Sequence, residues 1–123
     1  MAAAPQLLVQ TIRDVTIVDF RDSSILDTVQ IEQIGQQLFK LVDEQARKKL
    51  VLDFETVRFL SSSALGMLIT LRQKSQAIKG TMVLCNLRAN LMEVFQITNL
   101  HKLFTFATDE KAALATFGVT TAG

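Results

Sequence analysis

The chain has little of the chemistry on which most enzymes and metal sites depend. Of its 123 residues, one is a cysteine, Cys85, and one is a histidine, His101. A single cysteine excludes an intrachain disulfide, and one cysteine with one histidine cannot complete a structural zinc site. His101 is expected to be exposed in a loop, where no nucleophile and base can be assembled around it. We therefore predict a protein that is not an enzyme and that needs no metal or cofactor.

Strong charge of one sign is also missing. The 13 basic and 12 acidic side chains leave a net charge of +1, too little to attract nucleic acid or an anionic membrane. The longest apolar run, residues 64–71, ends at Arg72 and is too short to span a bilayer. Residues 1–10 do not have the basic and apolar segments of a signal peptide. We expect a cytoplasmic protein that binds neither nucleic acid nor membranes.

Hydrophobic residues make up 49% of the chain, and their spacing predicts alternating strands and helices. Strands are expected at residues 7–12, 15–20, 50–54, 81–87 and 103–106. Helices are expected at residues 27–48, 62–79, 89–98 and 109–117. This order predicts a single α/β domain, with a mixed and mainly parallel sheet, an N-terminal antiparallel hairpin and about four packed helices. We place the domain at residues 6–118 and expect flexible termini at residues 1–5 and 119–123.

The two longest predicted helices carry the apolar stripes that face the core. The first stripe is Ile31, Ile34, Leu38, Leu41 and Val42, and the second is Leu65, Leu68, Leu71, Ser75 and Ile78. Asp27 is a favourable N-cap for the first helix, whose basic C-terminal end at residues 47–49 complements the helix dipole. Gly80 is placed to stop the second helix.

One carboxylate, Asp53, is expected to be buried because it ends a central strand. Open α/β sheets place functional groups at this end of their strands. The more ordinary role for Asp53 is to accept hydrogen bonds from backbone amides of the following turn, and a functional role stays open beside it. Cys85 is predicted to be a buried, small hydrophobic residue in the next strand.

Three consecutive serines, Ser61, Ser62 and Ser63, stand at the start of the second predicted helix. One serine is enough to cap the free amides of the first turn. Gly66 weakens the helix unless something must approach it closely. A hydroxyl at a helix start is exposed, and helix amides would stabilise a phosphate that adds about −1.5 to −2 charges. The segment therefore suits a phosphorylation switch.

The same segment resembles the signature of bacterial anti-sigma-factor antagonists of the STAS domain family, in which Asp-Ser-(Ser/Thr)-Gly-Leu-Gly opens a helix. The corresponding residues here are Ser61, Ser62, Ser63, Ala64, Leu65 and Gly66. The resemblance continues through residues 80–85, 94–100 and 104–106, and so covers nearly the whole chain. It implies the STAS fold and a protein that acts by binding partners.

The resemblance also implies the partners and the site. Such antagonists bind an anti-sigma factor that is also a serine kinase of the GHKL type, and a serine phosphatase reverses the phosphorylation. Ser62 corresponds to the acceptor serine, and Asp27 to the family's Asp before the first long helix. The expected partner-binding residues are Asp27, Ser61, Ser62, Ser63, Ala64 and Gly66.

Two departures from the signature leave alternatives open. Ser61 replaces the family's Asp and Ala64 replaces its first Gly, so Ser61 and Ser63 remain possible acceptors. A STAS interaction scaffold that is never phosphorylated is the second hypothesis. The third is a small-ligand or nucleotide-binding domain that uses the serine-rich helix start as a phosphate cradle, although the chain has no Gly-rich phosphate loop.

Overall fold

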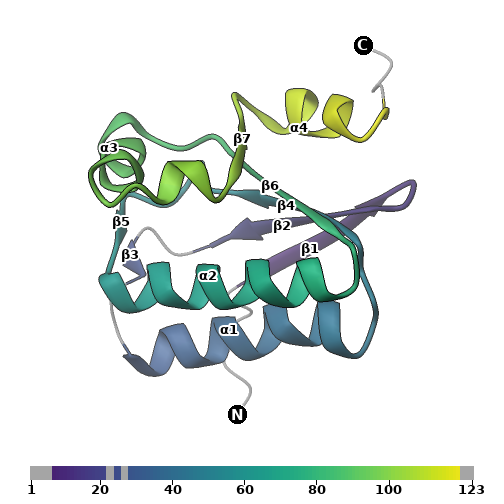
Figure 1. The fold of residues 1–123 in the computed structure, drawn as a ribbon, viewed down its shortest axis with the longest axis horizontal. Coiled ribbons are helices and arrows are strands. Elements are labelled where there is room, and N and C mark those ends of the chain that lie inside the picture. The colour runs from purple at the N-terminus through teal and green to yellow at the C-terminus, as the bar shows by residue number, and fades with distance from the viewer. Residues whose placement is uncertain (1–6, 22–23, 26–27, 120–123) are drawn as a thin grey trace.

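A five-stranded sheet in the order β1-β2-β4-β6-β7 organises the chain (Figure 1). The structure is a computed structural model that describes residues 7–21, 24–25 and 28–119. Its strands are β1 (Leu7–Ile12), β2 (Val15–Phe20), β3 (Ser24–Ile25), β4 (Lys49–Asp53), β5 (Phe59–Leu60), β6 (Thr81–Cys85) and β7 (Thr105–Ala107). Its helices are α1 (Thr28–Asp43), α2 (Ser62–Ala77), α3 (Ala89–Ile97), the 3₁₀ helix η1 (Leu100–Lys102) and α4 (Glu110–Thr116).

The sheet is mixed, as the sequence predicts. β1 and β2 form an antiparallel hairpin around Arg13 and Asp14, and β2, β4, β6 and β7 are parallel to one another. A second, two-stranded sheet pairs β3 with β5 in parallel and was not predicted. Strands of two residues are too short to leave a periodic pattern in the sequence.

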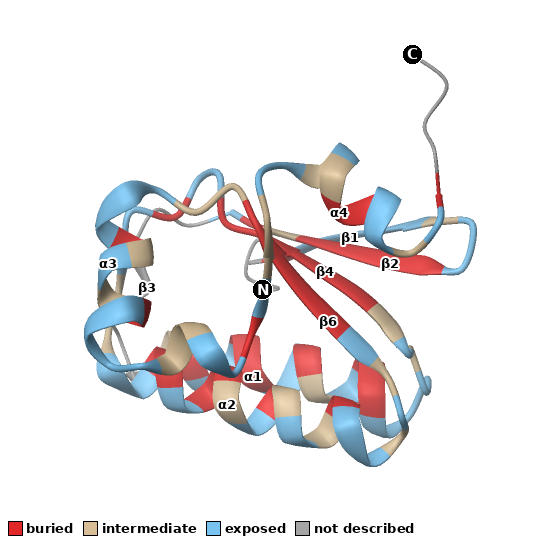
Figure 2. Cartoon of the chain, turned by 45° about the horizontal axis from the view of Figure 1, so that its top comes forward, coloured by how far each residue is buried: buried red, intermediate tan, exposed pale blue. Residues whose placement is uncertain are grey.

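Helices α1 and α2 pack side by side on one face of the sheet, and α4 lies on the other (Figures 1 and 2). The predicted stripe of α1 is buried in the larger core, and so are Leu65, Leu68 and Leu71 of α2. Helix α3 adds Leu91 and Phe95 to the same core. The two long apolar stripes are therefore confirmed as the main packing surfaces of the domain.

A smaller core lies under α4. It joins Val15, Ile17, Val51, Val83 and Cys85 of the sheet to Ala113 and Leu114 of α4 and to Val119. Cys85 is fully buried, as predicted. Val119, which we expected in a flexible tail, is only 6% exposed. The rest of the two predicted flexible termini, residues 1–5 and 120–123, lies outside the described residues, as does the N-cap expected at Asp27.

Helix α1 ends at Asp43, and the predicted extension to Lys48 is wrong. Ala46 has a φ of 51°, a left-handed conformation that a right-handed helix cannot contain. The amide of Arg47 donates a hydrogen bond to the carbonyl of Leu41, which satisfies one of the last carbonyls of the helix. Basic residues beyond this turn therefore lead into β4 and do not belong to the helix.

Gly80 does not act as the helix stop that its position predicts. Helix α2 ends at Ala77, and the left-handed residue after it is Lys79, with a φ of 59°. A Cβ at Gly80 would lie 2.7 Å from the carbonyl oxygen of Lys48 and 2.8 Å from the Oγ of Ser75. Glycine is therefore needed here because two backbone segments approach closely.

Candidate functional site

The segment between β4 and α2 is fixed by buried side chains and by hydrogen bonds to the start of α3. Phe54 and Val57 are fully buried, and the amide of Val57 donates to the carbonyl of Phe54 at 2.9 Å. The side-chain amide of Asn90 donates to the carbonyl of Arg58, also at 2.9 Å. These contacts fix the position of the segment that leads to the serines at the start of α2.

The pairing of β3 with β5 brings the segment before α1 next to the segment before α2. Ile25 lies opposite Leu60, immediately before the serines. Helices α1 and α2 both begin at this end of the molecule (Figure 1). Asp27 comes between β3 and α1 in the sequence and lies outside the described residues. Two large apolar side chains are exposed here, Val29 at 59% and Phe59 at 55%.

The three serines have different surroundings. Ser61 is the N-cap of α2, and its Oγ accepts a hydrogen bond from the amide of Ala64 at 3.2 Å. Ser62 and Ser63 are exposed in the first turn, which contains no acidic side chain. One serine therefore does the capping, and the other two present their side chains to solvent at the positive end of the helix dipole.

The two other residues predicted to bind partners also differ. Ala64 is fully buried, so its side chain is not on the surface. Gly66 is exposed, and a Cβ there would have no neighbour within 4 Å. Gly66 lines a groove of about 370 Å³ between α1 and α2, together with Ser63, Thr70 and residues of α1. The packing of the domain therefore does not require glycine at this position. A close approach by another molecule would explain a residue without a Cβ here.

Asp53 is buried at the end of β4, with 3% of its surface exposed. Its Oδ1 accepts a hydrogen bond from the amide of Glu55 at 2.9 Å, which is the ordinary role expected from the sequence. The side-chain amide of Asn86 donates to both carboxylate oxygens at 3.1 Å. These bonds explain how a charged side chain is accommodated in the core.

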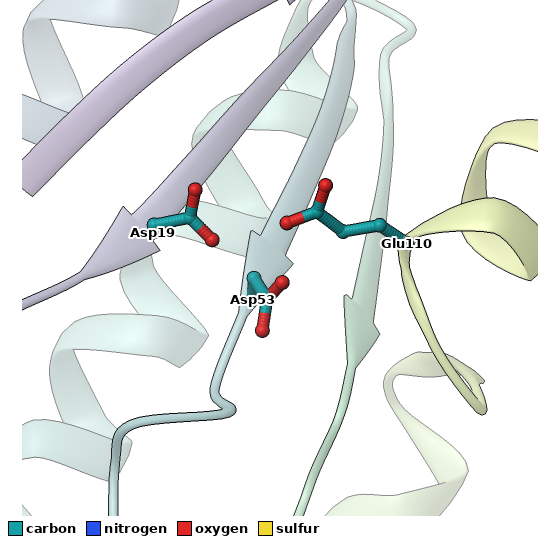
Figure 3. A group of neighbouring side chains, drawn as sticks. All are labelled: Asp19, Asp53 and Glu110. Atoms are coloured by element: carbon teal, nitrogen blue, oxygen red, sulfur yellow. The ribbon is translucent and has the colours of Figure 1, made fainter.

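Two further carboxylates that sequence reasoning missed join Asp53. Asp19 lies beside it in the register of β2 and β4, and Glu110 reaches it from the first turn of α4 (Figure 3). One oxygen of each residue lies within 4.8 Å of the others. Within the described ranges, no lysine, arginine or histidine forms a salt bridge with any of the three. Acidic groups of this kind are common without an ion, and we assign no metal.

The proximity of these groups changes how they titrate. The hydrogen bond to Asp53, together with burial, raises the pKa of Glu110 to about 8. Burial also raises the pKa of Asp19. For Asp53 burial acts in the same direction, but hydrogen bonds from Glu110, the Glu55 amide and Asn86 outweigh it and lower the pKa. Glu110 is therefore the group that carries a proton at neutral pH, because like charges this close do not all ionise.

Beside this acidic cluster, a hollow of about 720 Å³ opens at the carboxyl ends of β4 and β6. Its lining includes Arg88 and Lys111 as well as Asp53, Asp109 and Glu110, and it includes none of the three serines. The phosphate cradle expected from a nucleotide-binding domain therefore does not coincide with this hollow.

His101 lies in η1 and is partly buried, with its Nδ1 3.4 Å from the carbonyl oxygen of Phe95. The expectation that His101 is an exposed loop residue is therefore wrong. Among the described residues, no helix combines the length and apolar composition needed to cross a bilayer.

Residues 6–113 match the model of the STAS domain. The putative anti-sigma factor antagonist BtrV of Bordetella bronchiseptica is 29% identical over 93 residues, which cover 76% of this chain and 79% of that protein. A STAS domain anti-sigma-factor antagonist from Planctomyces limnophilus has a TM-score of 0.81 at 21% identity, with 93% and 98% of the two chains covered. Phosphorylated SpoIIAA of Bacillus has a TM-score of 0.70 at 21% identity, with 89% and 98% covered. These structures share the fold.

Proposed function

Because the chain belongs to the STAS domain family, we propose that it is an anti-sigma-factor antagonist whose partner binding is switched off by phosphorylation of Ser62. The observation that carries this proposal is the division of roles among the serines. Ser61 is engaged as the N-cap, whereas Ser62, which corresponds to the family's acceptor, is exposed at the helix start. The likeness to BtrV, named as a putative antagonist, supports the same function.

The geometry favours Ser62 over Ser61, whereas only the correspondence with the family's acceptor favours it over Ser63. The Oγ of Ser61 already accepts from the amide of Ala64, so a kinase would have to take this oxygen out of the N-cap before it could phosphorylate it. Ser63 is as free as Ser62 and lines the groove between α1 and α2. Ser63 therefore remains the alternative acceptor, while Ser61 is disfavoured by its structural role.

A phosphate on Ser62 would act on the partner more than on the fold. Amides at the start of α2 stabilise an anion by about 0.3–1 kcal/mol, so the domain tolerates the added charge. A partner packed over the helix start and the exposed ring of Phe59 would have to bury that charge against an apolar contact. The expected partner is an anti-sigma factor with GHKL-type serine kinase activity, with a serine phosphatase to reverse the modification. The protein would act in the cytoplasm by binding and without catalysis.

Two variants and a kinase reaction test the switch. Ser62→Asp should fold like the parent but fail to bind the anti-sigma partner in calorimetry, whereas Ser62→Ala should bind even after incubation with kinase and ATP. Gln73→Asp is the matched control, since it places the same charge at an exposed position of α2 away from the serines. Phosphate mapped to Ser63 by mass spectrometry would move the switch to that residue. If no phosphate is found and Ser62→Asp binds the partner as the parent does, the protein is an interaction scaffold that is not phosphorylated.

A further inference from the structure

The acidic cluster joins three separate elements of the chain. Asp19 comes from β2, Asp53 from β4 and Glu110 from α4, so the cluster lies where α4 meets the sheet (Figure 3). If all three side chains were ionised, their repulsion would push α4 away from the sheet. A proton between Glu110 and Asp53 converts one of these contacts into a hydrogen bond.

We propose that the contact of α4 with the sheet is a proton-dependent latch, closed while Glu110 carries a proton and loosened as that proton is lost. The latch is on the face of the sheet opposite to α1 and α2 (Figure 1). It does not depend on Ser62, and its test is independent of the proposed phosphorylation switch.

The other groups around Glu110 do not supply a counter-charge that would make the proton unnecessary. From the sheet, the acidic side chains of Asp19 and Asp53 face it, and Glu55 adds negative charge next to Asp19. Asp109, its neighbour in the chain, uses its Oδ1 to cap α4 through the amide of Ala112. The remaining groups nearby are the thiol of Cys85 and the cations Arg88 and Lys111, which line the hollow but form no salt bridge with the cluster within the described ranges.

The apolar part of the contact is small enough to open without unfolding the domain. Among the described residues from α4 onward, Ala113, Leu114 and Val119 are buried against the sheet, and Phe117 packs against them partly buried. The larger core under α1 and α2 is separate from this patch. Regions with few buried apolar contacts open locally at a lower free energy than the whole domain.

The direction of the pH effect follows from the proton count. The carboxyl of Glu110 holds its proton up to about pH 8 while α4 is docked, and releases it near its usual value of 4.5 when α4 is undocked. Between these limits, the docked form binds the extra proton, so rising pH favours undocking by up to about tenfold per pH unit. Above this range both forms are ionised and the dependence ends. The raised pKa of Asp19 acts in the same direction.

Cys85 reports on the latch because its thiol is fully buried beneath α4. The experiment measures the rate of thiol labelling of the native protein from about pH 5.5 to about pH 9, divided at each pH by the rate for the urea-unfolded chain. This ratio removes the intrinsic pH dependence of the thiol reaction. The protection of Cys85 should fall as pH rises and level off above about pH 8, while circular dichroism shows that the domain stays folded.

Matched variants identify the group responsible. Glu110→Gln keeps a hydrogen-bond donor at every pH, so its protection should be the same from the acidic to the alkaline end. Glu93→Gln removes an exposed carboxylate from α3 and should keep the pH dependence of the parent. If Glu110→Gln is unstable, Asp19→Asn offers a second test. Removing one neighbouring anion lowers the pKa of Glu110 in the docked form, so the fall in protection should be smaller and should level off at lower pH.

Two results would overturn the latch. Protection that is independent of pH in the parent, or equally dependent on pH in Glu110→Gln, would show that this carboxyl does not control α4. If millimolar Mg²⁺ or Ca²⁺ restored protection at about pH 9 in the parent and not in Glu110→Gln, the docking of α4 would depend on a bound cation and not on a proton.

Discussion

Helices α1 and α2 cover one face of the sheet with a broad apolar layer, whereas α4 covers the other with a small apolar patch bordered by Asp19, Asp53 and Glu110. The only buried charged residue among those described, Asp53, is on the α4 side. The first face is stabilised by burial of apolar surface, which does not depend on pH. The second combines a smaller apolar contact with titrating groups, so it should respond to solution conditions that leave the first unchanged.

This difference also separates the two proposals. Ser62 lies at the start of a helix anchored in the larger core, so a phosphate there would change the surface of a rigid element. Glu110 begins the seven-residue helix α4, which is held by few contacts. A charge gained at Glu110 should therefore change the position of the helix itself.

The largest effect is expected from a charge placed in the larger core. Leu68 is 1% exposed in the middle of α2, and Leu68→Asp should destabilise the domain by several kcal/mol because the new carboxylate has no partner. Thermal melting followed by circular dichroism measures this. Gln73→Asp, at an exposed position of the same helix, is the control. A Leu68→Asp variant that melts like the parent would contradict the packing of α2.

A truncation in the smaller core should act locally. Leu114 is 2% exposed under α4, and Leu114→Ala should cost about 2–5 kcal/mol in the contact between α4 and the sheet. Thermal melting measures the loss of global stability. We expect the labelling rate of Cys85 to rise by more than that loss predicts. In Leu68→Ala, the same truncation in the larger core, labelling and melting should change together. Equal behaviour of the two variants would show that the domain opens as one unit.

A smaller effect is expected at the start of α2. Ser61→Ala removes the oxygen that caps the amide of Ala64 and should cost about 1 kcal/mol. Ser63→Ala, in the exposed first turn, should cost much less, since Ser63 is not the N-cap. Urea denaturation of the two variants measures the difference. Similar midpoints would mean that Ser61 does not carry the capping role.

The smallest effect should be a stabilisation. Gly66→Ala adds a Cβ that meets nothing within 4 Å and replaces a poor helix former, so the domain should gain up to about 1 kcal/mol. The urea midpoint should rise. Binding of the anti-sigma partner, measured in parallel, should weaken if the partner approaches the groove at Gly66. A lower midpoint would contradict the open space that surrounds this residue.

Local patterns in the sequence were sufficient for most of the fold. The stripes from Ile31 to Val42 and from Leu65 to Leu71 have helical periodicity, and they predicted which sides of α1 and α2 are buried. The burial of Cys85 and the hydrogen bond that Asp53 accepts from the following turn were also predicted. The end of α1 was not, because the stop is made by a left-handed alanine, Ala46, and not by glycine or proline.

For the candidate site, the sequence by itself determined the serines and their placement at the start of a helix, because capping depends on neighbours within one turn. Only the tertiary structure decided that Ala64 is buried and that Gly80 permits a close approach to Lys48. The cluster of Asp19, Asp53 and Glu110 also comes from the tertiary structure. Its members are far apart in the chain. They meet because parallel pairing aligns the ends of β2 and β4, and because Glu110 at the start of α4 lies beside both carboxylates. No local periodicity encodes such a meeting, since it depends on strand register and on the packing of a helix against the sheet.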